Sequence, residues 1–150
     1  MRSHSRLLKA VTMAGILFTS CLLALFFLFV GYMKAFAPLA ELAQHHAWTV
    51  RLPEQAGRAV GWSEMGCALL LLIGMIRPLA GQIGAIALLF NQMVAATVHI
   101  AAGETGSLPQ NAVIILICTL IFCLQRRRRN IVRSGKKQRA SGQKDQADDQ

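Results

Sequence analysis

Between two lysines, Lys9 and Lys34, the chain reads AVTMAGILFTSCLLALFFLFVGYM (residues 10–33), a stretch without one charged side chain. A helix needs about 20 predominantly apolar residues to cross the hydrocarbon core of a bilayer. This stretch exceeds that length, and its second half is apolar on every side. It predicts a membrane-spanning helix over about residues 10–35.

Three further segments of similar length and character follow the first. Residues 59–76 carry one charged side chain, Glu64, whereas residues 78–103 and 105–125 carry none apart from His99. An apolar content of 54% and a mean hydropathy of +0.44 exceed what a soluble core of 150 residues encloses. The sequence therefore predicts an all-α membrane protein. Its membrane domain, residues 10–125, is a four-transmembrane-helix bundle with spans at about 10–35, 57–76, 79–102 and 109–125.

Basic residues predict how these spans are oriented. Lysine and arginine concentrate in the short loops that face the cytoplasm. Here they lie in the N-terminal segment 1–9, at Arg77 between the second and third spans, and from Arg126 onward after the fourth. The link 104–109 contains no lysine or arginine. We therefore expect both termini to be cytoplasmic, with residues 38–57 and 104–109 on the outer side.

The C-terminal segment, residues 126–150, carries much of the net charge of +9. It is rich in Gln, Ser and Gly and lacks aromatic residues, so we expect a disordered basic cytoplasmic tail. Its membrane-surface basic cluster is Arg126, Arg127, Arg128 and Arg129. Such clusters hold a helix end against anionic headgroups. Nucleic acid is not expected as a partner, because no aromatic residues for base stacking interleave with the basic ones.

One competing interpretation treats residues 1–37 as a cleavable secretion signal, since Ala35, Phe36 and Ala37 resemble a cleavage site. The apolar core of such signals usually has 7–15 residues. The core here is longer, and its removal would leave an odd number of spans. An uncleaved first span is preferred.

The four cysteines indicate packing rather than chemistry, because they lie in the spans and no two of them have CxxC spacing. His45 and His46 are expected in solvent. A haem would need a second histidine at the depth of His99, and none is evident. No metal site is predicted.

Polar residues within the spans are the best candidates for function. At about 1.5 Å per residue, Glu64, Gln92 and Asn111 each lie about 20 Å from the cytoplasmic charges. Lys34 and His99 lie closer to the outer surface. We expect these side chains to line one pocket in the outer half of the bundle. The candidate pocket residues are Lys34, Glu64, Gln92, His99 and Asn111.

Glu64 admits two interpretations. An ionised carboxylate at a helix centre costs about 2.5 to 3.5 kcal/mol on insertion scales, so it must be protonated, paired or hydrated. In the first interpretation, Glu64 forms a bond to another helix that only holds the bundle together. In the second, it belongs to a pocket that binds a small polar or quinone-like molecule or passes protons, as intramembrane ionisable groups commonly do.

Several short segments together resemble a known family. They are Gly31 to Lys34 at the end of the first span, Glu64, Gly66 and Leu69 to Gly74 in the second, Arg77 in the turn, and Val98 and His99 at the end of an alanine-rich third span. They resemble the DoxX family and its DoxX-like relatives, and the resemblance covers about residues 15–124.

The resemblance implies a multi-pass protein of the bacterial cytoplasmic (inner) membrane with four helices. The family takes its name from a subunit of a thiosulfate:quinone oxidoreductase, and most members have no known activity. By position, Lys34, Glu64 and His99 match recurrent polar positions of the family, and Asn111 matches a polar position at the start of the fourth helix. The basic tail lies outside the pattern.

Three functions fit these features. The first is a membrane component of a redox system, binding a quinone or small substrate near Glu64 and His99. The second is a non-catalytic assembly subunit that docks a partner protein. The third is a small proton-coupled transporter, which is disfavoured because small multidrug resistance transporters carry their acidic residue in the first helix. Quinone is the one cofactor considered, since no cofactor motif is evident, and the sequence leaves catalysis and oligomeric state open.

Overall fold

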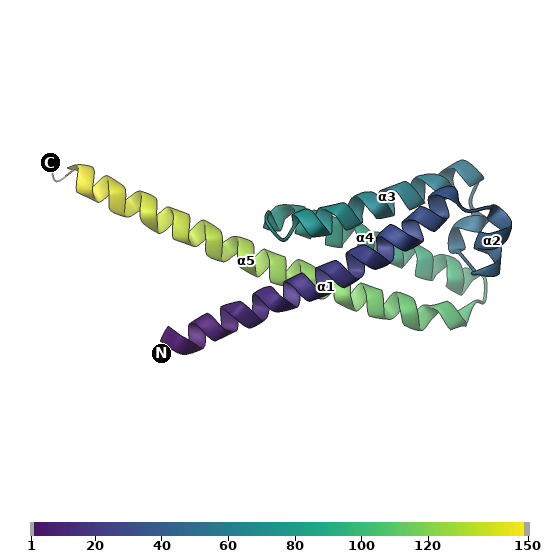
Figure 1. The fold of residues 1–150 in the computed structure, drawn as a ribbon, viewed down its shortest axis with the longest axis horizontal. Coiled ribbons are helices and arrows are strands. Elements are labelled where there is room, and N and C mark those ends of the chain that lie inside the picture. Colours follow the sequence, from purple (N-terminus) through teal and green to yellow (C-terminus); the bar gives the residue numbers. More distant parts are fainter. Residues whose placement is uncertain (1, 149–150) are drawn as a thin grey trace.

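The computed structural model describes residues 2–148, with side chains at residues 7, 10–131, 133 and 134. Within that range the chain is helical and forms no strand (Figure 1). The elements, in order, are α1 (Arg2–Phe36), α2 (Leu39–Gln44), the 3₁₀ helix η1 (Trp48–Arg51), α3 (Glu54–Ile73), α4 (Pro78–Ala101), the 3₁₀ helix η2 (Thr105–Ser107) and α5 (Leu108–Asp148).

Four of these helices are long and apolar enough to cross a membrane, counted over the described part of the chain. Their apolar stretches are Ala10–Phe36, Glu54–Ile73, Pro78–Ala101 and Thr105–Ile131. The prediction of an all-α protein with four helices able to span a membrane is confirmed, and the bounds of these stretches differ from the predicted spans by up to six residues, at the end of the fourth.

The four helices pack in an incomplete ring. Helix α1 packs along α3, α3 along α4, and α4 along α5, whereas α1 and α5 touch each other more sparsely. In Figure 1, α1 and α5 cross near the middle of the bundle and diverge on both sides of the crossing. The seam between α1 and α5 is therefore the least tightly closed side of the bundle.

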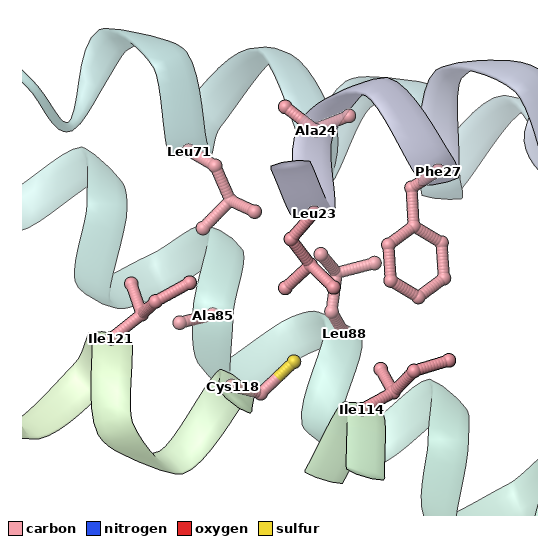
Figure 2. Packing of buried hydrophobic residues seen from close by; sticks show 10 residues of the cluster. Leu23, Ala24, Phe27, Leu71, Ala85, Leu88, Ile114, Cys118 and Ile121 are labelled. Atoms are coloured by element: carbon pink, nitrogen blue, oxygen red, sulfur yellow. The ribbon is translucent and has the colours of Figure 1, made fainter. Parts of the chain in front are cut away.

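A hydrophobic core fills the middle of the bundle and draws on all four long helices (Figure 2). Its members are Leu23, Ala24 and Phe27 of α1, Ala68 and Leu71 of α3, Ala85 and Leu88 of α4, and Ile114, Cys118 and Ile121 of α5. Cys118 packs inside this cluster, as expected for a packing residue. Large apolar side chains such as Phe18 and Leu116 point outward and are exposed, which suits a surface that lies in lipid.

Glycines set the distance between α1 and α3. A Cβ atom on Gly61 would lie 2.6 Å from the carbonyl oxygen of Gly31, and one on Gly31 would lie 2.7 Å from that of Gly61. No larger residue fits either position without moving a backbone, so the two helices touch at these glycines. Lys34 follows Gly31 on α1 by three residues, and Glu64 follows Gly61 on α3 by three residues, which is about one helical turn in each case.

One end of the bundle is covered by residues 39–51, which comprise α2 and η1 and are called the cap here. Arg58 of α3 holds the corner between α1 and the cap, where it donates hydrogen bonds to the carbonyl oxygens of Ala37 (2.5 Å) and Lys34 (3.1 Å). These bonds satisfy acceptors that the end of a helix leaves unpaired. The start of α1 and the end of α5 extend from the opposite end (Figure 1).

The C-terminal segment differs from the sequence-based expectation. Residues 126–148, predicted to be disordered, continue α5 as a helix to Asp148. The physical reason is that this segment extends a helix already formed, so it avoids the unfavourable nucleation step, and its Arg, Lys, Gln and Ala residues favour helix. Residues 149–150 of the predicted tail lie outside the described residues.

Candidate functional site

A cavity of about 320 Å³ lies at the capped end of the bundle, between α1, α4 and α5 and beneath the cap. Its apolar wall comes mainly from α1, through Phe26, Phe27, Phe29, Val30 and Met33. Its polar wall consists of Lys34, Gln92, His99 and Asn111. Residues at its mouth are His45 and His46 of the cap, Ser107 and Gln110. The cavity is therefore lined by apolar side chains mainly from α1 and by polar side chains from α1, α4 and α5.

The five predicted pocket residues are all buried. Their exposed fractions are 5% for Lys34, 1% for Glu64, 5% for Gln92, 4% for His99 and 6% for Asn111. The structure brings four of them to the cavity wall. Glu64 does not line the cavity and lies behind Lys34 instead.

Glu64 and Lys34 form a buried ion pair between α3 and α1. The Lys34 ammonium donates to Glu64 Oε1 at 2.5 Å, and Asn91 Nδ2 of α4 donates to the same oxygen at 2.6 Å. Three helices thus meet at one carboxylate oxygen. A buried charge is tolerated when it is paired and hydrogen-bonded in this way. The consequence for the cavity is that Glu64 holds the Lys34 ammonium at its wall.

Trp48, in the cap, closes the cavity over Lys34. The Lys34 ammonium lies 5.5 Å from the centre of the Trp48 ring, within the range of a cation–π interaction. The indole is buried, yet its Nε1 has no hydrogen-bond partner among the described residues. The same holds for Nδ2 of Asn111, on the far wall. Buried donors are rarely left unpaired, and both of these residues line the cavity.

His99 is joined to the surface through Glu104, which follows the end of α4. His99 Nδ1–H donates to Glu104 Oε2 at 2.9 Å, and Arg51 of η1 donates to Glu104 Oε1. The hydrogen bond from His99, and after it the one from Arg51, lowers the pKa of the Glu104 carboxyl. An ionised Glu104 can only accept, so it fixes the proton of a neutral His99 on Nδ1 and leaves a lone pair on Nε2.

Four residues of the site were not among the candidates predicted from the sequence. Asn91, Trp48, Arg51 and Glu104 all take part in the contacts described above. Glu104 lies five positions after His99 along a chain that must turn there, a spacing that could have drawn notice. His45 and His46 are exposed, as predicted, yet both also lie at the cavity mouth. His46 has a positive φ of 52°.

The basic cluster at the other end of the bundle divides into two pairs. Arg126 and Arg127 are exposed. Arg128 Nη1 donates to the carbonyl oxygens of Met75 (2.7 Å) and Gly74 (3.3 Å), and Arg129 Nη1 donates to Gln82 Oε1 (3.3 Å). Gln125 Nε2 also donates to Gly74 O at 3.1 Å. Half of the predicted membrane-surface cluster thus holds the turn between α3 and α4.

Comparison with known proteins gives one match. The profile of the DoxX-like family matches residues 18–121, which include the cavity, the buried ion pair and the core of all four spans, but not the basic cluster. Neither the curated proteins nor the solved structures provide a significant match.

Proposed function

This chain belongs to the DoxX-like family of membrane proteins, and from that premise we propose that it is the membrane component of a redox system that binds a quinone in the cavity beneath the cap. The observation that carries the proposal is the pair of buried, unpartnered donors, Trp48 Nε1 and Asn111 Nδ2, which share one cavity with the Lys34 ammonium.

The donors on the wall match the chemistry of a quinone head. A quinone has two carbonyl oxygens that accept hydrogen bonds and no polar hydrogen of its own. Lys34, Trp48 and Asn111 all line the cavity, and each carries N–H groups that can donate hydrogen bonds. A carbonyl oxygen near Asn111 or Trp48 would satisfy a buried donor that has no other partner in the described structure.

The shape of the cavity also suits a molecule with an apolar tail. Its volume of about 320 Å³ lies at the lower end of the range of small-molecule sites, about 300 to 1,000 Å³. That space holds a ring with its substituents but no long isoprenoid chain. Phe29 of α1 lines the cavity and is also exposed, and α1 packs only sparsely against α5. The tail would leave through the seam between α1 and α5 into lipid.

The distribution of lysine and arginine supports an orientation with the capped end on the outer side, and the membrane that we propose is the bacterial inner membrane. In that orientation the quinone head would lie in the outer half of the bilayer. The electrons would pass to or from a partner protein on that side. This arrangement makes the chain a quinone-binding subunit.

Tryptophan fluorescence gives a direct test. In a Trp62→Phe variant, Trp48 is the remaining tryptophan, and it lies at the cavity. Decylubiquinone or a short-chain menaquinone, added to the protein in mild detergent, should quench its emission in a saturable way. The Asn111→Leu variant should bind about fivefold more weakly, because it loses one hydrogen bond of about 1 kcal/mol.

Thr119→Val is the matched control, since Thr119 lies on an exposed part of the same helix and its hydroxyl bonds only Ile115 O. Its quenching curve should equal that of the parent. Equal, non-saturating quenching in all three proteins would contradict quinone binding. Native mass spectrometry of protein extracted from its own membrane should show bound quinone. A partner subunit at fixed stoichiometry, with no quinone, would favour the assembly role instead.

A further inference from the structure

The histidine at the cavity wall is arranged differently from the other polar groups around it. His99 Nδ1–H is committed to Glu104 at 2.9 Å, whereas Nε2 has no hydrogen bond among the residues that the structure describes. The ring is 4% exposed and lines the cavity. Lys34 and Trp48 only donate hydrogen bonds, whereas Gln92 and Asn111 supply amide oxygens, which accept hydrogen bonds but are weak bases. A neutral His99 adds a strong acceptor to this wall.

We propose that His99 is the proton acceptor of this cavity, taking a proton at Nε2 from a hydroxyl of the bound ligand, with Glu104 as the residue that positions it. The inference rests on the proposed function, because the hydroxyl belongs to the reduced form of the same ligand class, a quinol or related phenol. In the step, the ligand O–H bond breaks, an N–H bond forms at Nε2, and the ligand oxygen keeps the electron pair as an oxyanion.

Both products of this transfer have stabilising neighbours. The imidazolium lies against the Glu104 carboxylate and in the last turn of α4, where the helix dipole favours a positive charge. The oxyanion would lie in the same cavity as the N–H donors of Lys34, Trp48 and Asn111, of which Trp48 Nε1 and Asn111 Nδ2 are unpartnered in the described chain. This is the division of roles expected of general acid–base chemistry with a preorganised anion site.

A route for the proton to leave is also present. The Glu104 side chain is 29% exposed, whereas that of His99 is 5% exposed. Glu104 therefore connects a buried imidazole to water at the capped end. Arg51 contacts the same carboxylate and favours its ionised form. The proton can thus be handed from the cavity to the aqueous phase without opening the cap.

The other titratable groups around the cavity do not fit this role. Glu64 accepts two hydrogen bonds at Oε1, from Lys34 and Asn91, and although its Oε2 has no partner among the described residues, it does not line the cavity. Lys34 is the cation of a buried ion pair and can only donate. His45 and His46 lie at the mouth and are exposed. His99 is the buried base that the cavity wall offers among the described residues.

A coloured phenol tests this assignment. An alkylated 4-nitrophenol is nearly colourless as the phenol and yellow as the phenolate, so its absorbance reports where the proton is. At a pH below the phenol's own pKa, binding to the full-length protein in detergent should produce the phenolate band. Expressed as a titration, the apparent pKa of the bound phenol should shift downward.

The His99→Gln variant should lose that shift, and Glu104→Gln should reduce it, since a glutamine no longer fixes the tautomer of His99. The Thr119→Val variant, changed at an exposed position outside the cavity, should keep it. Trp48 quenching in the Trp62→Phe background reports binding separately. Binding of the phenol without a phenolate band, or a band that persists in His99→Gln, overturns the inference and leaves quinone binding intact.

Two remaining results are also decisive. If neither phenol nor quinone quenches Trp48, the proposed function fails and the inference fails with it. If His99→Gln does not fold, as judged by gel filtration, the Glu104→Gln variant decides, because an unchanged phenolate band there contradicts the positioning role.

Discussion

At the scale of single residues, the ion pair between Lys34 and Glu64 is the strongest determinant of the site. Its side chains are 6% and 0% exposed, and Asn91 shares the same carboxylate oxygen. We expect Lys34→Met to lower the free energy of unfolding by about 3 to 5 kcal/mol, because it leaves a buried carboxylate without its cation. Unfolding in mixed detergent micelles measures this loss.

The double variant Lys34→Met/Glu64→Leu should recover much of that stability, because an apolar pair of similar volume replaces both charges. Losses that simply add in the double variant would contradict a coupled pair. The double variant also separates two roles of Lys34. It should restore the fold and still bind quinone weakly, since the cavity has lost a donor.

Glu104 leads to a prediction on pH. Its pKa is lowered in the folded protein, so its contact with Arg51 and His99 stabilises the closed cap at pH above the ordinary value of 4.5. That contribution is lost as the pH falls through the lowered value. In a Trp62→Phe background, the emission of Trp48 should shift to longer wavelength over that range, as the cap loosens and water reaches the indole.

A Glu104→Gln variant provides the comparison for this titration. It should show a looser cap already at neutral pH and no further step on acidification. An unchanged acid step in that variant would assign the transition to another carboxyl group, such as Glu41 or Glu54.

How much of the site could be predicted follows from the same chemistry. Lys34, Glu64, Gln92, His99 and Asn111 stand out because each interrupts an apolar helix, and an interruption there needs a reason. Arg51 and Glu104 lie in polar connecting segments, where a charged residue is ordinary. Their contact joins residues 53 positions apart and depends on how the cap folds back. Sequence spacing holds no signal for it.

At the scale of the helices, the glycine contact between α1 and α3 sets the geometry of the ion pair. Gly61→Ala would place a methyl group 2.6 Å from Gly31 O, so the helices must separate and the Lys34–Glu64 bond must lengthen. We expect a loss of about 1 to 3 kcal/mol in mixed-micelle unfolding. Gly66→Ala, in the same helix but with open space around it, should be neutral or stabilising by up to about 1 kcal/mol.

Arg128 and Arg126 of α5 allow a second comparison, between a hydrogen-bonded and an exposed arginine. Arg128 bonds the carbonyl oxygens of Gly74 and Met75, so Arg128→Gln should destabilise the turn between α3 and α4 by about 1.5 to 3 kcal/mol. Arg126 is exposed, and Arg126→Gln should leave stability unchanged within about 0.5 kcal/mol. Hydrogen exchange at Met75 to Arg77 localises the effect. Equal protection in both variants would contradict the proposed clamp.

The spans could be predicted because their lengths and low charge admit few alternatives. Which helices pack against each other could not be predicted, because the outside of a helix in lipid is apolar and so does not mark the face that contacts another helix. Small residues mark contact faces but do not name the partner helix. The helical continuation of α5 was also missed, because composition describes an isolated segment, whereas this one extends an existing helix.

At the scale of the whole molecule, four spans place the start of α1 and the end of α5 at the same end of the bundle (Figure 1). We expect that end to face the cytoplasm. Green fluorescent protein fused after Gln150 should fluoresce, and alkaline phosphatase fused at Gln44 in the cap should be active, since each reporter works on one side of the membrane. The reverse pattern would put the cavity in the cytoplasmic half and would remove the outward proton route.

The four consecutive arginines after Gln125 make different contacts, because successive residues of a helix point about 100° apart. Their phase alone turns Arg128 and Arg129 toward the α3–α4 turn and leaves Arg126 and Arg127 outside. Glutamine at 126 and 127, or glutamine at 128 and 129, gives variants of identical composition and charge, yet only the second variant loses the hydrogen bonds to Gly74, Met75 and Gln82. Two variants of the same composition would thus differ in whether the turn between α3 and α4 stays bonded to α5.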